Sequence, residues 1–322
     1  MKIEDKLYGK KEIKEKILID LINSPSIQRL KDISQLGMPD EYMHLKGFSR
    51  YEHSLGVMFF LKKIGASLEE QIAGLLHDAS HTPFSHVIDW VLGDPTKEDY
   101  QDKIHKTFLE NSEIPSILKK HNFNTEFIYN LKNFTLLEKK APSLCADRLD
   151  YSLRQIKIKD KRNLTQRVLN NLSVRNNQIV FLDEKIAENF AEEYMCLQKY
   201  QWAGDQARTR YHILSEILKK ALEKDLINFE DFKKTETPIL QILNESKEKF
   251  ILDNLCLLKK GFRTTYDENG IELKKKFRYI DPEILVNGSY FPLSKLSKSY
   301  FNLIESEKKQ KDEIRKIKII PN

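Results

Sequence analysis

The chain has 322 residues, of which 40% are hydrophobic and 32% charged, and its formal net charge is +6. This composition is typical of a folded globular protein and excludes a disordered one, and no apolar run is long enough to span a membrane. The modest positive charge permits nucleic acid as a partner without indicating it. Three widely spaced cysteines indicate neither a disulfide framework nor a zinc ribbon, which predicts a cytoplasmic protein.

Helical patterns dominate the first half of the chain, after a polar arm over residues 1–12 that we expect to be extended. Apolar residues repeat at helical spacing, and Ser, Thr or Pro residues mark several helix starts. The expected helices cover 14–22, 26–36, 51–65, 68–77, Thr82-Pro83 to Gly93, a segment ending near His105, two segments within 113–139, and Pro142 to Gln155, with a loop over 37–50.

The second half begins after a charged linker, residues 157–162, and contains fewer but longer helices. A strand is expected at 178–182, and helices at 184–202 and 208–224. From about residue 258, β-branched and aromatic residues predict strands at 274–280, 282–286 and 314–320, with turns at Asn269-Gly270 and Asn287-Gly288. We therefore predict a mostly α fold with a core (1–160), a helical extension that completes the pocket (161–257) and a small α/β region (258–322).

Histidines are concentrated in one part of the chain, because five of the eight lie between positions 53 and 105. The adjacent pair His77-Asp78 ends an apolar helix, and His53 lies on the apolar stripe of its own helix. A buried aspartate without a partner is costly, and a metal ion or a cation from another helix would relieve that cost. Because imidazole and carboxylate are the ligands that borderline divalent metals prefer, this cluster indicates a metal site.

A second polar cluster lies on the helix expected to end near Gln155. Asp147, Asp150, Tyr151 and Arg154 follow the spacing i, i+3, i+4, i+7 and therefore share one helix face. Spacing alone supports a solvated face with internal salt bridges as well as it supports a functional one. Leu144 and Tyr151 border the same face, which favours the functional interpretation.

These motifs, in this order, resemble the HD-domain phosphohydrolases, whose signature is H…HD…D. They are most similar to the dNTP triphosphohydrolase branch, which contains bacterial dGTPases and the vertebrate sterile-alpha-motif and HD-domain dNTPase. The resemblance covers roughly residues 26–155 and is loose beyond them. The matching stretches are Gln28-Arg29-Leu30, Gln35-Leu36-Gly37, Ser49-Arg50-Tyr51-Glu52-His53-Ser54-Leu55-Gly56-Val57, Ile72-Ala73-Gly74-Leu75-Leu76-His77-Asp78, His81-Thr82-Pro83-Phe84-Ser85-His86 and Asp147-Arg148-Leu149-Asp150-Tyr151.

The resemblance implies an HD catalytic core in residues 1–160, a divalent metal cofactor (Mn, Mg, Fe, Zn, Ni or Co), a nucleotide substrate and a homo-oligomer. The implied metal ligands are His53, His77, Asp78 and Asp147. The implied catalytic groups are Asp78, His81, His86 and His105, and the sequence around His105 matches the family poorly. The implied substrate contacts are Gln35, Leu36, Arg50, Arg148, Asp150, Tyr151, Arg154 and Gln155.

Gln155 departs from this branch, which usually has an aspartate there that helps to fix the sugar 3′-hydroxyl. Glutamine is an uncharged and weaker acceptor, so the departure concerns selection of the sugar and leaves the metal site untouched. Arg208 and Arg210 are further candidates for phosphate contacts. We interpret both as ordinary surface arginines, since no motif supports them.

Taken together, the residues predict a metal-dependent phosphohydrolase that converts a dNTP to nucleoside and tripolyphosphate. Metal-bound water would be the nucleophile, Arg50 would contact phosphate, and His81 or His105 could protonate the leaving alkoxide. One alternative is an HD-type phosphodiesterase or nuclease acting on a signalling nucleotide or a nucleic-acid end, although the only concentrated basic run, 308–318, is interrupted by acids. Another is a non-catalytic nucleotide-binding HD module, against which the four filled ligand positions argue.

Overall fold

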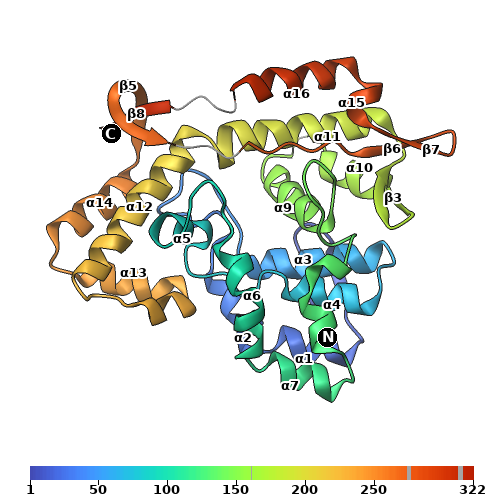
Figure 1. The fold of residues 1–322 in the computed structure, drawn as a ribbon, viewed down its shortest axis with the longest axis horizontal. Coiled ribbons are helices and arrows are strands. Elements are labelled where there is room, and N and C mark those ends of the chain that lie inside the picture. The colour runs from blue at the N-terminus through green and yellow to red at the C-terminus, as the bar shows by residue number, and fades with distance from the viewer. Residues whose placement is uncertain (161, 274–276, 311–314) are drawn as a thin grey trace.

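The computed structural model describes residues 1–160, 162–273, 277–310 and 315–322, and its mostly helical architecture confirms the predicted fold class (Figure 1). The helices of the first half are α1 (Lys16–Ile22), α2 (Pro25–Gln28), α3 (Arg50–Lys63), α4 (Leu68–Leu76), α5 (Ile88–Val91), α6 (Tyr100–Glu110), α7 (Ile114–Lys120), α8 (Thr125–Tyr129) and α9 (Ala146–Lys157). Those of the second half are α10 (Leu164–Asn171), α11 (Glu184–Cys196), α12 (Asp205–Glu223), α13 (Glu236–Glu245), α14 (Lys249–Lys260), α15 (Leu293–Leu296) and α16 (Lys298–Gln310).

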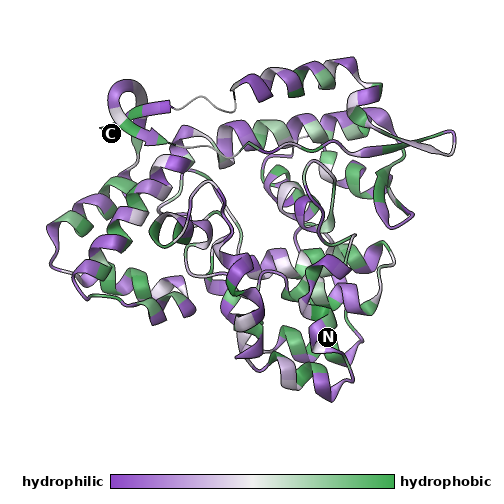
Figure 2. Cartoon of the chain, in the orientation of Figure 1, coloured by the Kyte–Doolittle hydropathy of each residue, from purple (hydrophilic) through white to green (hydrophobic). Residues whose placement is uncertain are grey.

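Short 3-10 helices and one π-helix join these elements. The 3-10 helices are Arg29–Asp32, Ser85–Val87, Leu131–Asn133 and Phe229–Lys233, and the π-helix Leu197–Trp202 continues α11. Each main helix in Figure 2 carries both hydrophilic and hydrophobic residues, as expected when one face is buried. Among the described residues, no helix combines the length and apolar character needed to cross a bilayer.

The strands of the described residues form three small sheets. They are β1 (Lys2–Asp5), β2 (Gly9–Glu12), β3 (Leu172–Arg175), β4 (Gln178–Phe181), β5 (Phe262–Leu273), β6 (Glu283–Val286), β7 (Ser289–Pro292) and β8 (Arg315–Pro321). The expected N-terminal arm is a hairpin, in which β1 and β2 pair antiparallel. Strand order β3-β4-β6-β7 gives a four-stranded sheet, and β5 pairs with β8.

Several expected elements differ from the observed ones near residue 270. The Asn269-Gly270 turn is a bulge inside β5, where the register with Ile317 of β8 jumps from Tyr266 to Ile271. The strand expected at 274–280 lies partly outside the described residues, and its described part, 277–280, is not a strand. The Asn287-Gly288 turn is confirmed, because both residues have positive φ and join β6 to β7.

Helix ends also shift. The helix expected from Pro142 begins at Ala146, and the one expected over 26–36 is a single turn followed by a 3-10 helix. Thr82-Pro83 precedes the 3-10 helix Ser85–Val87 rather than capping a regular helix.

Two hydrophobic cores hold the molecule together. The first core lies between α3, α4, α9 and α11 and includes Leu61, Ile72, Leu149 and Phe190. The second core, built mainly by α12, α13 and α14, includes Phe84 and Ile217. Each core draws on residues from both halves of the chain, and the division at residues 160 and 257 stays a prediction.

Candidate metal centre and substrate pocket

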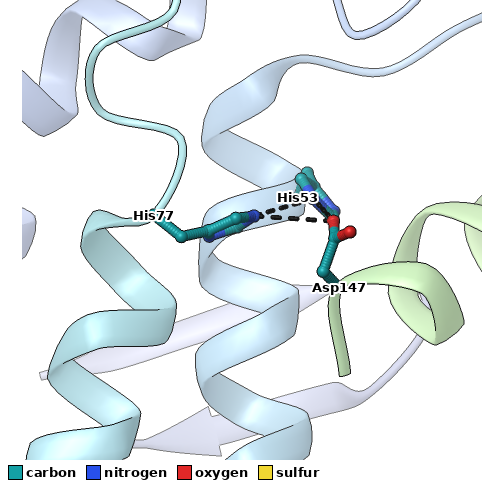
Figure 3. A group of neighbouring side chains, drawn as sticks. All are labelled: His53, His77 and Asp147. Atoms are coloured by element: carbon teal, nitrogen blue, oxygen red, sulfur yellow. Dashed lines mark hydrogen bonds and ion pairs between the residues drawn. The ribbon is translucent and has the colours of Figure 1, made fainter. Parts of the chain in front are cut away.

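Three elements bring His53, His77 and Asp147 together (Figure 3). His53 comes from α3, which begins with a capping box between Ser49 and Glu52. His77 immediately follows α4, and Asp147 lies in the first turn of α9. His53 Nε2 is 3.0 Å from Asp147 Oδ1 and 3.3 Å from His77 Nε2, while His77 Nε2 is 3.6 Å from Asp147 Oδ1.

The second nitrogen of each imidazole fixes which atom faces this cluster. His77 Nδ1 lies 2.7 Å from the carbonyl of Gly74, and His53 Nδ1 lies 2.8 Å from Asp150 Oδ2. Because each Nδ1 donates to an oxygen, each neutral ring carries its lone pair on Nε2. Two such lone pairs 3.3 Å apart repel each other unless a cation lies between them.

Asp78 lies beside this cluster. One of its oxygens, Oδ1, is 3.5 Å from His77 Nε2, and the other, Oδ2, is 3.7 Å from His53 Nε2. Metal–ligand bonds of about 2.1 Å at right angles separate neighbouring donor atoms by about 3.0 Å. The separations of 3.0–3.6 Å among His53 Nε2, His77 Nε2 and Asp147 Oδ1 are close to that value, so these three side chains fit a divalent ion, with Asp78 beside them.

Electrostatics in the cluster favour a bound cation. Burial opposes charge on His77, but Asp78 and Asp147 outweigh it and raise the pKa of His77 to about 9. Burial likewise opposes charge on Asp147, but hydrogen bonds from His53 and His77 hold the pKa of Asp147 well below its usual range. A proton takes the cation's place when no metal is bound, so metal binding must release it.

A cavity of about 410 Å³ opens onto this cluster. It brings together most of the residues predicted for the site. Those that line it are Gln35, Leu36, Arg50, His77, Asp78, His81, His86, Asp147, Arg148, Tyr151 and Gln155. Arg50 is 3% exposed and donates to Asp78 Oδ2 (2.6 Å) and Ser85 Oγ (2.8 Å), so it also fixes the carboxylate.

Besides the predicted metal ligand His53, which is 0% exposed, three predicted residues lie behind the lining of the cavity. Asp150 and Arg154 are buried and ion-paired to each other, and Asp150 also accepts from His53, so the two support a metal ligand. His105 is buried beside Ser80 Oγ at 3.0 Å, and burial lowers its pKa to about 4. The structure does not bring these three side chains to the cavity wall.

The cavity also has lining residues that the sequence did not predict. Arg208 is buried and lines the cavity, so its interpretation as a surface arginine is wrong. Arg278 also lines the cavity, and both arginines pair with Glu98, at 2.9 and 3.1 Å. Arg210 is also buried, but it donates to the carbonyls of Tyr42 and Leu258. No motif surrounds any of them, so only the fold could identify them.

Aromatic and acidic groups complete the wall. Trp202, from the π-helix, meets the Tyr151 ring edge-on at 5.2 Å, and the Tyr151 hydroxyl pairs with Tyr194 at 2.7 Å. Glu138 pairs with Arg148 at 3.1 Å, and loss of hydration together with the charge of Asp147 raises the pKa of Glu138 to about 7. A π-helix at a cavity is a recurrent feature of functional sites.

Two amides at the cavity wall have unused acceptors. The Oε1 atoms of Gln35 and Gln155 are buried and have no hydrogen-bond partner among the described residues. Gln155 Nε2 donates to the carbonyl of Lys46 at 3.3 Å, which leaves Oε1 as the acceptor. Buried polar atoms are nearly always paired, so these two acceptors at the cavity wall are exceptions.

Comparison with known proteins gives consistent relatives. The HD-domain family profile matches residues 50–151. The chain is 39% identical to the uncharacterized protein YdhJ of Bacillus subtilis (strain 168), over 92% of each chain. It is 27% identical to the metal-dependent phosphohydrolase cns2 of Cordyceps militaris, over 90% of this chain and 86% of that one.

A more distant relative and a solved structure extend this result. The chain is 24% identical to the deoxynucleoside triphosphate triphosphohydrolase SAMHD1 homolog of Dictyostelium discoideum, over 57% of this chain and 42% of that one. The crystal structure of a phosphohydrolase from Bacteroides thetaiotaomicron superposes with a TM-score of 0.72 at 17% identity, covering 100% of this chain and 99% of that one. The second likeness concerns the fold alone.

Proposed function

Because this chain belongs to the HD-domain family of metal-dependent phosphohydrolases, we propose that it cleaves deoxynucleoside triphosphates to nucleoside and tripolyphosphate. A divalent metal ion is its cofactor. The observation that carries the proposal is one cavity that combines the metal cluster, four arginines and aromatic rings. The family relative named as a dNTP triphosphohydrolase supports the same substrate class. A homo-oligomeric state and a cytoplasmic location stay predictions.

The arginines are suited to hold a chain of phosphates. Arg50, Arg148, Arg208 and Arg278 line the cavity and come from α3, α9, α12 and the segment after β5. Guanidinium groups bind phosphate oxygens through two parallel hydrogen bonds, and their charge offsets that of the polyphosphate. Four of them suit a triphosphate better than a phosphomonoester.

The unpaired amides and the aromatic rings are suited to the nucleoside. Gln155 Oε1 can accept a hydrogen bond from a sugar hydroxyl, and Gln35 Oε1 can accept one from the base. Tyr151 and Trp202 offer ring surface for packing against the sugar and base. Since Gln155 is uncharged, we expect weaker discrimination between sugars than an aspartate would provide.

A bound divalent ion supplies a deprotonated water as nucleophile and neutralises charge on the phosphate under attack. Arg50 holds Asp78 in place beside the cluster and adds a positive charge at the same wall. His86 lies 3.3 Å from Asp89 and 5.2 Å, ring to ring, from His81. We assign to His86 the protonation of the leaving alkoxide, since its ring lines the cavity and Asp89 orients it.

The test is product identification. The purified protein is incubated with Mn²⁺ or Mg²⁺ and with each dNTP and NTP in turn, and products are separated by ion-exchange chromatography. We expect nucleoside and tripolyphosphate, with loss of turnover in Asp147→Asn and a fall in kcat of about 10²- to 10⁴-fold in His86→Gln with metal still bound. His121→Gln is the matched control. His121 directly follows α7 and pairs with Asp20 of α1, and neither residue lines the cavity.

Two outcomes would contradict the proposal. Release of pyrophosphate or single phosphates would assign the cleavage to a different bond. Failure to turn over any triphosphate, with metal bound, would favour the phosphodiesterase alternative, which the same preparation can test with cyclic dinucleotides and short oligonucleotides.

A further inference from the structure

The first twelve residues reach the metal centre through Asp150, a carboxylate that is 0% exposed. Its Oδ2 accepts from His53 Nδ1 and from Arg154 Nε, each at 2.8 Å. Its Oδ1 accepts from the hydroxyl of Tyr8, also at 2.8 Å. Tyr8 lies in the turn of the β1–β2 hairpin, 142 positions before Asp150 in the chain.

A second contact ties the same hairpin to this group. Arg154 NH2 donates to Asp5 Oδ2 at 2.7 Å, and Asp5 Oδ1 accepts from the backbone of Leu7 and Tyr8. Asp5 therefore shapes the turn that presents Tyr8 and also balances the charge of Arg154. The carboxylates and the guanidinium are at most 7% exposed, so each charge depends on its neighbours in the group.

Helix α3 is shaped to admit this group. Gly56 follows His53 by one turn, and a Cβ at Gly56 would overlap with Asp150 Oδ1 and Arg154 NH2. The carboxylate and guanidinium thus occupy the space that a side chain would need. Glycine is otherwise unfavourable inside a helix, by roughly 1 kcal/mol relative to alanine, so this position serves the close approach.

We propose that Tyr8 and Asp5 of the N-terminal hairpin are positioning residues for the metal ligand His53, acting through Asp150 and Arg154. Tyr8 and Arg154 hold Asp150 in one orientation, and Asp150 in turn keeps the proton of His53 on Nδ1. The Nε2 lone pair then remains directed at Asp147 and His77. The hairpin is therefore part of the metal centre. This inference rests on His53 being a metal ligand, and it is independent of the substrate.

Metal affinity is the direct test, with Co²⁺ as the probe because its visible absorption reports both binding and ligand geometry. Partners of a metal-bound histidine typically change affinity by 10- to 100-fold when removed. We expect Asp150→Asn to weaken Co²⁺ binding by about 100-fold and Tyr8→Phe by about tenfold, with a changed spectrum. Tyr300→Phe is the matched control, since its buried hydroxyl donates to the carbonyl of Ile280 away from the cluster.

Asp5→Asn provides a second variant, and thermal unfolding with chelator present shows whether each variant is folded. Equal affinities for wild type, Tyr8→Phe and Asp5→Asn would overturn the inference, as would an equal loss in Tyr300→Phe. His53→Ala separates the two assignments. If it keeps full Co²⁺ affinity, the proposed ligand set fails; if it loses affinity while both hairpin variants do not, only the role of the hairpin fails.

Discussion

Glu236 is a buried carboxylate that joins two loops of the cavity wall. It is 1% exposed and lies at the start of α13. It accepts hydrogen bonds from Ser34 N (2.8 Å), Ser34 Oγ (2.7 Å) and Phe84 N (3.2 Å). Phe84 has φ of 65°, a conformation that an aromatic residue rarely adopts without support. Glu236 thereby fixes Ser34, which precedes Gln35, and Phe84, which lies three residues after His81.

The same carboxylate gives a prediction about stability and pH. Burial raises the pKa of Glu236 to about 7, although its three hydrogen bonds oppose the rise. The folded state therefore binds a proton more tightly than the unfolded state between pH 4.5 and 7. The contribution of Glu236 to the free energy of unfolding falls as pH rises through that window. Across this window, the contribution of Glu236 to the free energy of unfolding falls by about 3 kcal/mol. We expect Glu236→Gln to remove that part of the slope in denaturant titrations at pH 5 and pH 8.

Glu188→Gln is the matched control for this measurement. Glu188 is also largely buried, but hydrogen bonds from Lys185, Ser297 and Ser299 lower its pKa to about 2. Its contribution is lost only as pH falls below about 4.5, so Glu188→Gln should lower stability and keep the wild-type slope between pH 5 and 8. A Glu236→Gln protein with the wild-type slope would show that Glu236 does not titrate in this window.

The sequence could indicate individual site residues only where local pattern and chemistry coincide. The sequence could indicate four such residues, because polar or charged side chains occur there among neighbours that predict burial. They are His53, His77, Asp78 and Asp147. Glu236 and Arg278 carry no such local signal, since their partners lie far away in the chain. Helical spacing singled out Asp150 and Arg154, but it could not show that they lie behind the cavity wall with partners in the hairpin.

At the scale of elements, α3 carries both a metal ligand and the glycine that admits its supporting group. In Gly56→Ala, the added Cβ overlaps with Asp150 and Arg154. The gain in helix propensity is about 1 kcal/mol, whereas overpacking a tight interior costs about 1–3 kcal/mol and here also displaces a buried charged pair. We therefore expect a net loss of about 2 kcal/mol in unfolding free energy, measured in urea, together with weaker metal binding.

Gly93→Ala is the control, because its Cβ would meet Asp89 only at 3.3–3.4 Å and its φ is not positive. Its stability should stay within about 0.5 kcal/mol of wild type. A Gly56→Ala protein as stable as wild type would show that Asp150 and Arg154 can move aside. In that case helix propensity would outweigh the packing.

Elements were predictable where periodicity was long and strong. The buried stripe of α3 and the apolar run of α4 made both helices evident. Helices α13, α14 and α16 were not predicted, because exposed apolar residues such as Phe250, Leu252 and Phe301 blur their patterns. Local turn chemistry predicted a turn at Asn269-Gly270, but these residues form a bulge within β5, which pairs with the distant β8.

At the scale of the whole molecule, the cavity is lined by residues that pack against both cores. Tyr151 and Trp202 pack on the first core, whereas Met43 and Tyr211 pack on the second. The metal cluster comes from α3, the residues directly after α4 and the start of α9, while Arg208 and Tyr211 belong to α12. A metal ion therefore contacts one side of the cavity, and a ligand that fills it contacts both.

This arrangement predicts separate effects of metal and nucleotide on hydrogen exchange. Mn²⁺ alone should slow amide exchange in α3, at the end of α4 and in the first turn of α9, because ligands fixed by an ion open less often. A non-hydrolysable dNTP analogue added with Mn²⁺ should extend the protection to the first half of α12. Mass spectrometry of deuterated peptides measures both effects.

Asp147→Asn serves as the control, since it lacks a metal ligand and should lose the first effect and most of the second. If Mn²⁺ alone protects α12 as much as Mn²⁺ with the analogue does, the two cores are already coupled through packing. If the analogue adds no protection, the nucleotide does not bind in the cavity. Only protection of α12 that depends on both metal and nucleotide fits a substrate held by Arg208 on one side and by the metal cluster on the other.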